Sequence, residues 1–213
     1  MDKKERIEFI LKEKLLFIIR TDDLESAMRC FDALVEGGAK VIEFTSTIPN
    51  YDLAIKKAKE VILNDGILIG AGTVLDKTLA IKAMEGDPDF IVNPIQNFEI
   101  FDVIPNDRVV FLGGFTPTEI ILSYKRGADF VKIFPASVLG PKFIRAIKKG
   151  PLPFVKILAS GGMDIELIND YIMEGVDVIG VGSEVVSREL IKEKNFSKIC
   201  TLTKEYISKV KGI

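Results

Sequence analysis

The chain has 213 residues, of which 47% are hydrophobic, and this is enough to bury the core of a single domain spanning residues 1–213. Its 29 basic and 31 acidic residues are interspersed and leave a net charge of −2, so no nucleic-acid partner is expected. Histidine is absent, which excludes histidine-based triads and acid–base chemistry and removes the commonest metal ligand, so no metal site is expected.

Residues 1–14 are predicted to form an extra N-terminal helix ahead of a repeating pattern. From residue 15 onward, short apolar runs alternate with amphipathic helical segments. The apolar runs are rich in Val, Ile and Phe and cover residues 15–20, 41–45, 67–74, 90–94, 109–114, 130–136, 155–162 and 178–185. Their nearly continuous hydrophobicity is typical of parallel strands that are covered on their outer face.

The segments between these runs carry helix signals, clearest at 24–38, 51–66, 117–127 and 164–175. Thr116-Pro117 and Gly162–Asp164 are interpreted as helix starts. The glycines expected to close helices are Gly37, Gly66, Gly127, Gly150 and Gly175. Eight strand–helix units in about 200 residues predict a closed (β/α)₈ TIM barrel. The alternative is a doubly wound open sheet, but the chain lacks a dinucleotide-binding fingerprint.

Barrel enzymes place their active sites at the C-terminal ends of the strands, and Lys132 lies in that region of the sixth strand. Strand alternation puts Phe130, Lys132 and Phe134 on one face and Val131 and Ile133 on the other, so Lys132 should point into the barrel. Desolvation lowers the pKa of a lysine, and a neutral amine can attack a carbonyl to form a Schiff base. The alternative is a structural lysine paired with a carboxylate, and position alone does not decide between the two.

Glu43 shares a face of the second strand with Thr45, and it is expected to be buried. An unpaired buried carboxylate is costly, so Glu43 needs a partner, for which Lys132 is the candidate. Glu43 then either moves protons during Schiff-base chemistry or forms a structural ion pair. Both interpretations predict that Glu43 lies near Lys132. Lys156 also interrupts an apolar strand, but it lies near the strand's start and is interpreted as structural.

Glycine and hydroxyl residues follow the last two predicted strands, namely Ser160, Gly161, Gly162, Gly182 and Ser183. Barrels frequently bind phosphate at these two loops through backbone N–H groups, so a phosphate site is expected there. A plain turn at each place is the alternative. Thr73, after Gly70-Ala71-Gly72 at the end of the third strand, is expected to contact substrate, with a tight turn as the alternative.

Five segments in order, EGGAKVIEFT, IGAGTV, VKIFPAS, SGGM and GVGSEV, resemble the family of 2-keto-3-deoxy-6-phosphogluconate and 4-hydroxy-2-oxoglutarate aldolases. The resemblance spans residues 15–190. It implies a class I aldolase without a cofactor, commonly a homotrimer, that splits a 2-oxo acid into pyruvate and an aldehyde such as glyceraldehyde 3-phosphate or glyoxylate.

The resemblance also assigns roles. Lys132 forms the Schiff base and Glu43 shuttles protons. The substrate contacts are Thr45, Thr73, Asn93, Pro94 and Phe134, and the phosphate contacts are Ser160, Gly161, Gly162, Gly182 and Ser183.

The chain departs from the family pattern where many members carry an arginine shortly after Glu-x-Thr. That stretch is Thr45–Ile48 here, and Arg20 at the end of the first strand is expected to bind the substrate carboxylate instead. A surface arginine is the alternative. Asn93, Ser160 and Gly113-Gly114 also depart from the pattern, which leaves the aldehyde half of the substrate and its phosphorylation open.

Two other functions remain open. One is a phosphosugar isomerase or epimerase with Glu43 as base, and the other is a barrel that binds a phosphorylated metabolite without catalysis.

A cytoplasmic protein without a membrane partner is expected, because no apolar run approaches ~18 residues and the N-terminus lacks the apolar core of a signal peptide. Cys30 and Cys200 have neither metal-site spacing nor the density of a disulfide scaffold.

Overall fold

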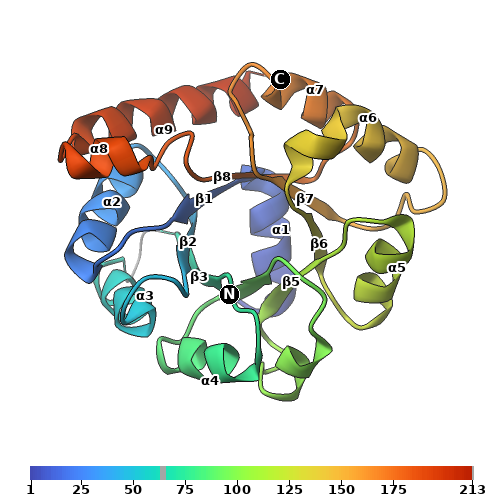
Figure 1. Cartoon of the computed structure of the whole chain (residues 1–213), viewed down its shortest axis with the longest axis horizontal. Coiled ribbons are helices and arrows are strands. Elements are labelled where there is room, and N and C mark those ends of the chain that lie inside the picture. Colours follow the sequence, from blue (N-terminus) through green and yellow to red (C-terminus); the bar gives the residue numbers. More distant parts are fainter. Residues whose placement is uncertain (63–65, 213) are drawn as a thin grey trace.

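Eight parallel strands form the centre of the protein, for which a computed structural model describes residues 1–62 and 66–212. Within these residues the strands pair in chain order, and the last pairs with the first to close a barrel (Figure 1). The strands are Leu15–Ile19 (β1), Val41–Thr45 (β2), Leu68–Gly72 (β3), Phe90–Asn93 (β4), Val109–Gly113 (β5), Phe130–Ile133 (β6), Ile157–Ser160 (β7) and Val178–Val181 (β8). Each strand lies inside one predicted apolar run, so the closed barrel is confirmed and the open sheet is wrong.

All helices except Lys3–Glu13 (α1) surround the barrel and cover the outer face of its strands (Figure 1). The others are Leu24–Glu36 (α2), Tyr51–Val61 (α3), Lys77–Glu85 (α4), Pro117–Lys125 (α5), Ala136–Lys148 (α6), Ile168–Met173 (α7), Arg188–Lys192 (α8) and Phe196–Lys211 (α9). A 3₁₀ helix, Phe98–Asp102 (η1), stands between β4 and β5. The predicted alternation of strands and helices is therefore confirmed around the barrel, except that the short 3₁₀ helix η1 takes the place of an α-helix between β4 and β5.

The predicted start of α5 is confirmed by a reciprocal cap. The Thr116 hydroxyl accepts a hydrogen bond from the Glu119 N–H at 3.3 Å, and the Glu119 carboxylate accepts one from the Thr116 N–H at 2.7 Å. Gly127 and Gly175 follow α5 and α7 with φ of 102° and 97°, the left-handed conformation that favours glycine after a helix. These helix ends follow from local sequence chemistry alone.

Two other helix boundaries differ from the prediction. The segment 164–175 is helical only from Ile168, because residues 165–167 form a turn in which the Leu167 N–H donates to the Asp164 carbonyl at 2.9 Å. The helix predicted to end at Gly66 ends at Val61, and residues 63–65 lie outside the described part of the chain. A local pattern of apolar residues does not distinguish a turn from the first turn of a helix.

Side chains from alternate strand positions fill the barrel interior. Phe90, Phe111 and Phe130 form its aromatic part, with ring centroids 5.7 Å apart for the first pair and 4.5 Å apart for the stacked second pair. Val131 and Ile133 of the same strand instead pack in the layer between strands and helices. The alternation predicted for the sixth strand is therefore confirmed, with Phe130 and Lys132 on the inner face.

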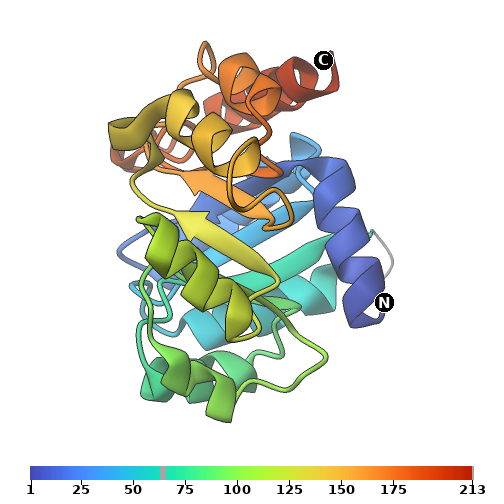
Figure 2. The ribbon, with the colours of Figure 1, turned by 90° about the vertical axis from the view of Figure 1, so that its right-hand side faces the viewer.

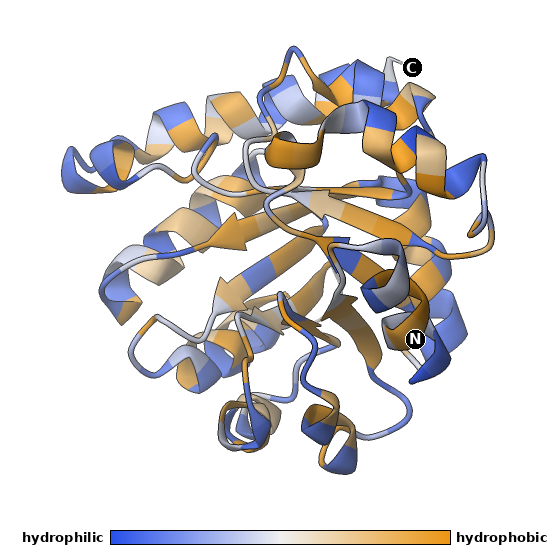
Figure 3. Ribbon diagram, turned by 45° about the vertical axis from the view of Figure 1, so that its right-hand side comes forward, coloured by the Kyte–Doolittle hydropathy of each residue, from blue (hydrophilic) through white to orange (hydrophobic). Residues whose placement is uncertain are grey.

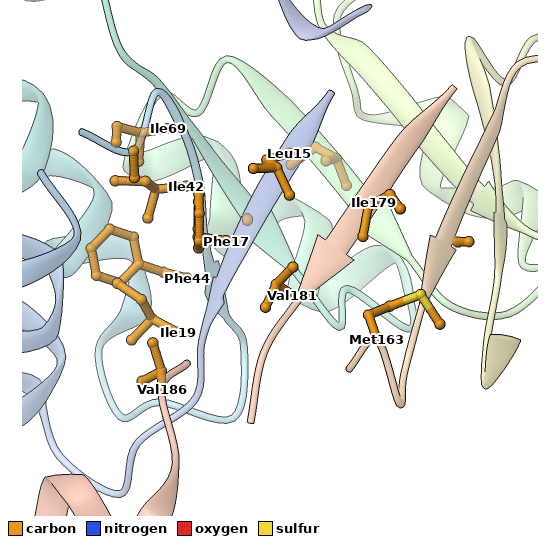
Figure 4. Packing of buried hydrophobic residues seen from close by; sticks show 14 of the residues in the cluster. Leu15, Phe17, Ile19, Ile42, Phe44, Ile69, Met163, Ile179, Val181 and Val186 are labelled. Carbon is orange, nitrogen blue, oxygen red and sulfur yellow. The ribbon is translucent and has the colours of Figure 1, made fainter. Parts of the chain in front are cut away.

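The outer apolar layer is continuous around the barrel. Figure 3 shows that the strands are mostly hydrophobic, whereas the helices carry hydrophilic residues as well. Figure 4 shows part of this layer, where Phe17, Phe44, Ile179 and Val181 project from neighbouring strands. Because both faces of the strands are buried, the sequence of each strand reads as an almost unbroken apolar run.

The predicted N-terminal helix α1 covers the barrel at the end where the strands begin (Figure 2). Ile10 belongs to the interior apolar cluster, and Arg6 and Lys3 reach Asp89 at 3.4 Å and Asp129 at 2.9 Å. Since α1 covers this end, a ligand has to enter at the opposite end, where the strands finish. Among the described residues, no helix combines the length and the apolar character that crossing a membrane requires.

Candidate active site

A cavity of about 490 Å³ opens at the C-terminal ends of the strands. Nine residues predicted for the site line it, namely Arg20, Thr73, Pro94, Lys132, Phe134, Ser160, Gly161, Gly182 and Ser183. They follow or end β1, β3, β4, β6, β7 and β8, so residues far apart in the sequence meet because parallel strands finish at the same end of the barrel. A cavity of this size accommodates a small metabolite.

Lys132 lies on the cavity wall with only 5% of its surface exposed. Burial is the main cause that lowers the pKa of its ammonium below the usual 10.5, and the positive charge of Arg20 lowers it further. The carboxyl of Glu43 acts in the opposite direction. The amino nitrogen lies 5.6 Å from the centroid of the Phe134 ring. The environment thus makes the amino group easier to deprotonate than that of a lysine in water, and the neutral amine is the nucleophilic form.

Glu43 is completely buried, and neither of its carboxylate oxygens has a hydrogen-bond partner within the described part of the chain. Burial raises the pKa of this carboxyl, while the charges of Lys132 and Arg20 act to lower it. The sequence predicted Lys132 as its partner, and the two groups interact electrostatically without a direct hydrogen bond. The carboxyl is thus held by charge interactions with Lys132 and Arg20 and not by a hydrogen bond among the described residues.

Gly72 provides the space for that carboxyl. β2 and β3 are neighbours, and a Cβ atom on Gly72 would collide with Oε1 of Glu43. Any side chain at this position would force the carboxyl to move. Gly72, the second glycine of the IGAGTV segment, is therefore required by the close approach of Glu43 and not by a turn.

Arg20 and Thr73 meet across the mouth of the barrel. Nη2 of Arg20 donates a hydrogen bond to Oγ1 of Thr73 at 3.1 Å, and both residues line the cavity. Arg20 is therefore directed into the cavity, as expected for a group that binds a carboxylate. Thr73 has φ of 55°, an unusual conformation for a β-branched residue.

The loops after β7 and β8 are held together by a carboxylate of the chain itself. Glu184 accepts hydrogen bonds from the N–H groups of Gly162 and Met163, both at 3.1 Å, and from the N–H of Gly182 at 2.9 Å. Gly161 and Gly162 have φ of 89° and 71°, a backbone conformation that residues with a side chain rarely adopt. In this structure the carboxylate of Glu184 therefore occupies the N–H groups of Gly162 and Gly182, two of the residues predicted to bind phosphate.

Four residues predicted for the site do not line the cavity, and Glu43, which is completely buried, is one of them. The Thr45 hydroxyl is buried against that of Thr47 at 2.8 Å. Asn93 shares the outward face of β4 with Ile91, and its Oδ1 accepts a hydrogen bond from the N–H of Ile95 at 2.9 Å. Gly162 contributes its N–H to Glu184 instead. Asn93 therefore shapes the turn that carries Pro94.

The sequence reasoning missed four residues that line the cavity: Ile18, Glu184, Val186 and Arg188. Two signals were available. Glu184 directly follows Gly182-Ser183, and Ile18 occupies an inward position of β1 two residues before Arg20. Arg188 begins α8, a short helix whose position could not be read from its sequence. Among the described residues, no three His, Cys, Asp or Glu side chains gather as a metal site would require.

Comparisons with known proteins agree with this geometry. A family model described as KDPG and KHG aldolase matches residues 7–202. The 2-dehydro-3-deoxy-phosphogluconate aldolase of Pseudomonas aeruginosa is 28% identical over 211 residues, covering 97% of this chain and 94% of that protein. A probable 2-dehydro-3-deoxy-6-phosphogalactonate aldolase of Rhizobium meliloti is 32% identical over 176 residues, which is 82% of each chain.

Among solved structures, the KDPG aldolase of Legionella pneumophila superimposes with a TM-score of 0.82 at 26% identity, covering 93% of this chain and 96% of that chain. It was solved with pyruvate captured at low pH as a covalent carbinolamine intermediate. The family model spans all eight strands, including those that carry Lys132, Glu43 and the glycine loops. The chain therefore belongs to the KDPG and KHG aldolase family.

Proposed function

We propose that the protein is a class I aldolase that splits a 2-oxo acid into pyruvate and an aldehyde through a Schiff base on Lys132. The observation that carries the proposal is a nearly buried lysine on the cavity wall whose pKa is lowered by burial and by Arg20. A neutral amine at this place can attack the C2 carbonyl of a 2-oxo acid. Membership of the family supports the same chemistry.

The reaction sequence follows from the groups around Lys132. The amine adds to the C2 carbonyl to give a carbinolamine, which takes up a proton and loses water to form an iminium ion. Removal of the C4 hydroxyl proton then breaks the C3–C4 bond, releases the aldehyde and leaves an enamine. Protonation at C3 and hydrolysis return pyruvate and the free lysine. Glu43, a buried carboxyl without a hydrogen-bond partner, is the proposed carrier of these protons, and Arg20 the group that binds the substrate carboxylate.

The aldehyde half is proposed to extend toward the loops after β7 and β8. Ser160, Gly161, Gly182 and Ser183 line that side of the cavity, and Glu184 lies there as well. The negative charge of Glu184 opposes the binding of a phosphate group nearby, and it does not affect a neutral aldehyde in this way.

Replacing Glu184 with Gln is therefore expected to lower KM for glyceraldehyde 3-phosphate in the condensation with pyruvate by about fivefold. The KM for unphosphorylated glyceraldehyde should change less than twofold. Glu189→Gln is the matched control, because Glu189 is an exposed acidic residue in the first turn of α8 and does not line the cavity. Equal changes for both aldehydes would show that Glu184 does not act through its charge.

The isomerase or epimerase alternative gains no support, since it would leave the lowered pKa of Lys132 without a use.

The homotrimer and the cytoplasmic location are proposed on the resemblance and the composition. Large apolar side chains that are exposed in the single chain, such as Val138 at 72% and Phe154 at 52%, are candidates for burial between subunits. Light scattering in solution measures the number of subunits directly.

The direct test is reduction in the presence of pyruvate. Borohydride should trap one pyruvate-derived adduct per chain, visible by intact-mass measurement, and peptide mapping should place it on Lys132. Borohydride without pyruvate is the control and should leave the mass unchanged. Turnover of a 2-oxo acid without any trapped adduct would overturn the proposal and favour a mechanism without a Schiff base.

A further inference from the structure

Thr73 has a backbone conformation that needs external support. Its φ of 55° lies in the left-handed region, which β-branched residues rarely adopt. Such a conformation persists only where surrounding contacts determine it, and residues with such a conformation cluster at functional sites. The contacts around Thr73 therefore indicate which residues maintain this part of the cavity.

Ser46 makes two of those contacts. Its N–H donates to the carbonyl of Gly72 at 2.7 Å, and its hydroxyl donates to the carbonyl of Thr73 at 2.6 Å. One residue at the end of β2 thus holds two successive carbonyls at the end of β3. On the other side, the Val74 N–H donates to the carbonyl of Val92 at 3.2 Å, so the turn is fixed from both neighbouring strands.

The turn determines where the Thr73 side chain lies. Oγ1 of Thr73 accepts the hydrogen bond from Nη2 of Arg20 at 3.1 Å. Arg20 follows β1, Ser46 follows β2 and Thr73 follows β3, so the three residues come from three adjacent strand ends. Arg20 is an exposed residue, and its hydrogen bond to the Thr73 hydroxyl restricts the orientation of its guanidinium.

We propose that Ser46 is a positioning residue for carboxylate recognition, which holds Thr73 in its left-handed turn so that Thr73 directs Arg20 into the cavity. The inference rests on the proposed function, because Arg20 is the group assigned to the substrate carboxylate. Ser46 does not line the cavity, and its hydroxyl contacts the carbonyl of Thr73 and not the cavity itself.

Ser46→Ala is expected to raise the pyruvate concentration that gives half-maximal borohydride trapping by about three- to tenfold, the effect of one hydrogen bond. The limiting trapping rate at saturating pyruvate should change less than twofold, because Lys132 is untouched. Ser46→Thr keeps the hydroxyl and should restore most of the affinity. Thr47→Val is the matched control, since the exposed Thr47 bonds Thr45 rather than Thr73.

A double-mutant cycle with Arg20→Gln separates positioning from a general structural effect. In the Arg20→Gln background, Ser46→Ala should change the half-maximal concentration less than twofold, because the group that Ser46 positions is gone. An equal effect in both backgrounds, or no effect in either, would overturn the inference while leaving the Schiff base intact.

Failure of the proposed function has a different result, which is the absence of any adduct in the unmodified protein. The inference remains testable in that case through equilibrium binding. Calorimetric titration of pyruvate into Lys132→Met and into Lys132→Met/Ser46→Ala measures carboxylate binding without covalent chemistry. Weaker binding to the double variant supports the role of Ser46, and equal binding contradicts it.

Discussion

Replacing Lys132 with Met is expected to abolish the pyruvate adduct and to lower kcat/KM for the 2-oxo acid at least about a thousandfold. Met fills the place of the lysine stem on the inner face of β6 but has no nitrogen to attack the carbonyl. The substitution removes the cost of keeping an amine in this nearly buried place. It also removes the Lys132 charge that lowers the pKa of Glu43, so that carboxyl shifts toward its neutral form and the fold should not be weakened. Borohydride trapping, steady-state rates and thermal unfolding measure the three effects.

Lys156→Met is the matched control for this prediction. Lys156 directly precedes β7, at the end of the barrel opposite the cavity, and it does not line the cavity. The control variant should keep the adduct and change kcat/KM less than about threefold, as distant surface substitutions usually do. If Lys132→Met retained trapping, or if both variants lost it, the nucleophile would have to be another group.

The architecture could be predicted because its signals are local and repeated. Each strand is buried on both faces, which leaves an apolar run that no half-exposed strand would show. The start of α5 was predictable because Thr116 and Glu119 cap each other within a few residues. The late start of α7 and the 3₁₀ helix η1 were not, since both depend on how a loop packs against the barrel.

The site residues were predictable where the strands alone determine their position, and they were missed where contacts between loops determine it. Lys132 and Arg20 were predictable because strand alternation and the position of strand ends determine where they lie. Ser46 and Glu184 were missed because their partners are backbone groups of other loops, and spacing in the sequence does not reveal such contacts. For Glu43, alternation predicted the inward face, but the missing hydrogen bond became visible only with the neighbouring Gly72 in place.

The pH dependence of adduct formation is expected to shift in opposite directions in two variants. Only neutral Lys132 attacks pyruvate, so the second-order rate constant for adduct trapping should rise with pH. The midpoint of this rise should lie below the usual lysine pKa of 10.5. The charge of Glu43 raises the pKa of Lys132, so Glu43→Gln should move the midpoint to lower pH. The charge of Arg20 lowers this pKa, so Arg20→Gln should move the midpoint to higher pH.

Each shift is separable from a loss of binding, because the midpoint of the profile does not depend on its height. Glu43→Gln should also reduce kcat for the complete reaction by about 10²-fold or more, since it removes the proposed proton carrier. Arg188→Gln is the control for charge, because Arg188 lines the cavity but is not among the groups that shift the pKa of Lys132. Its midpoint should stay in place. Shifts in the same direction in Glu43→Gln and Arg20→Gln would mean that the midpoint does not report the Lys132 amine. The titrating group would then be one that exchanges a proton after the Schiff base has formed.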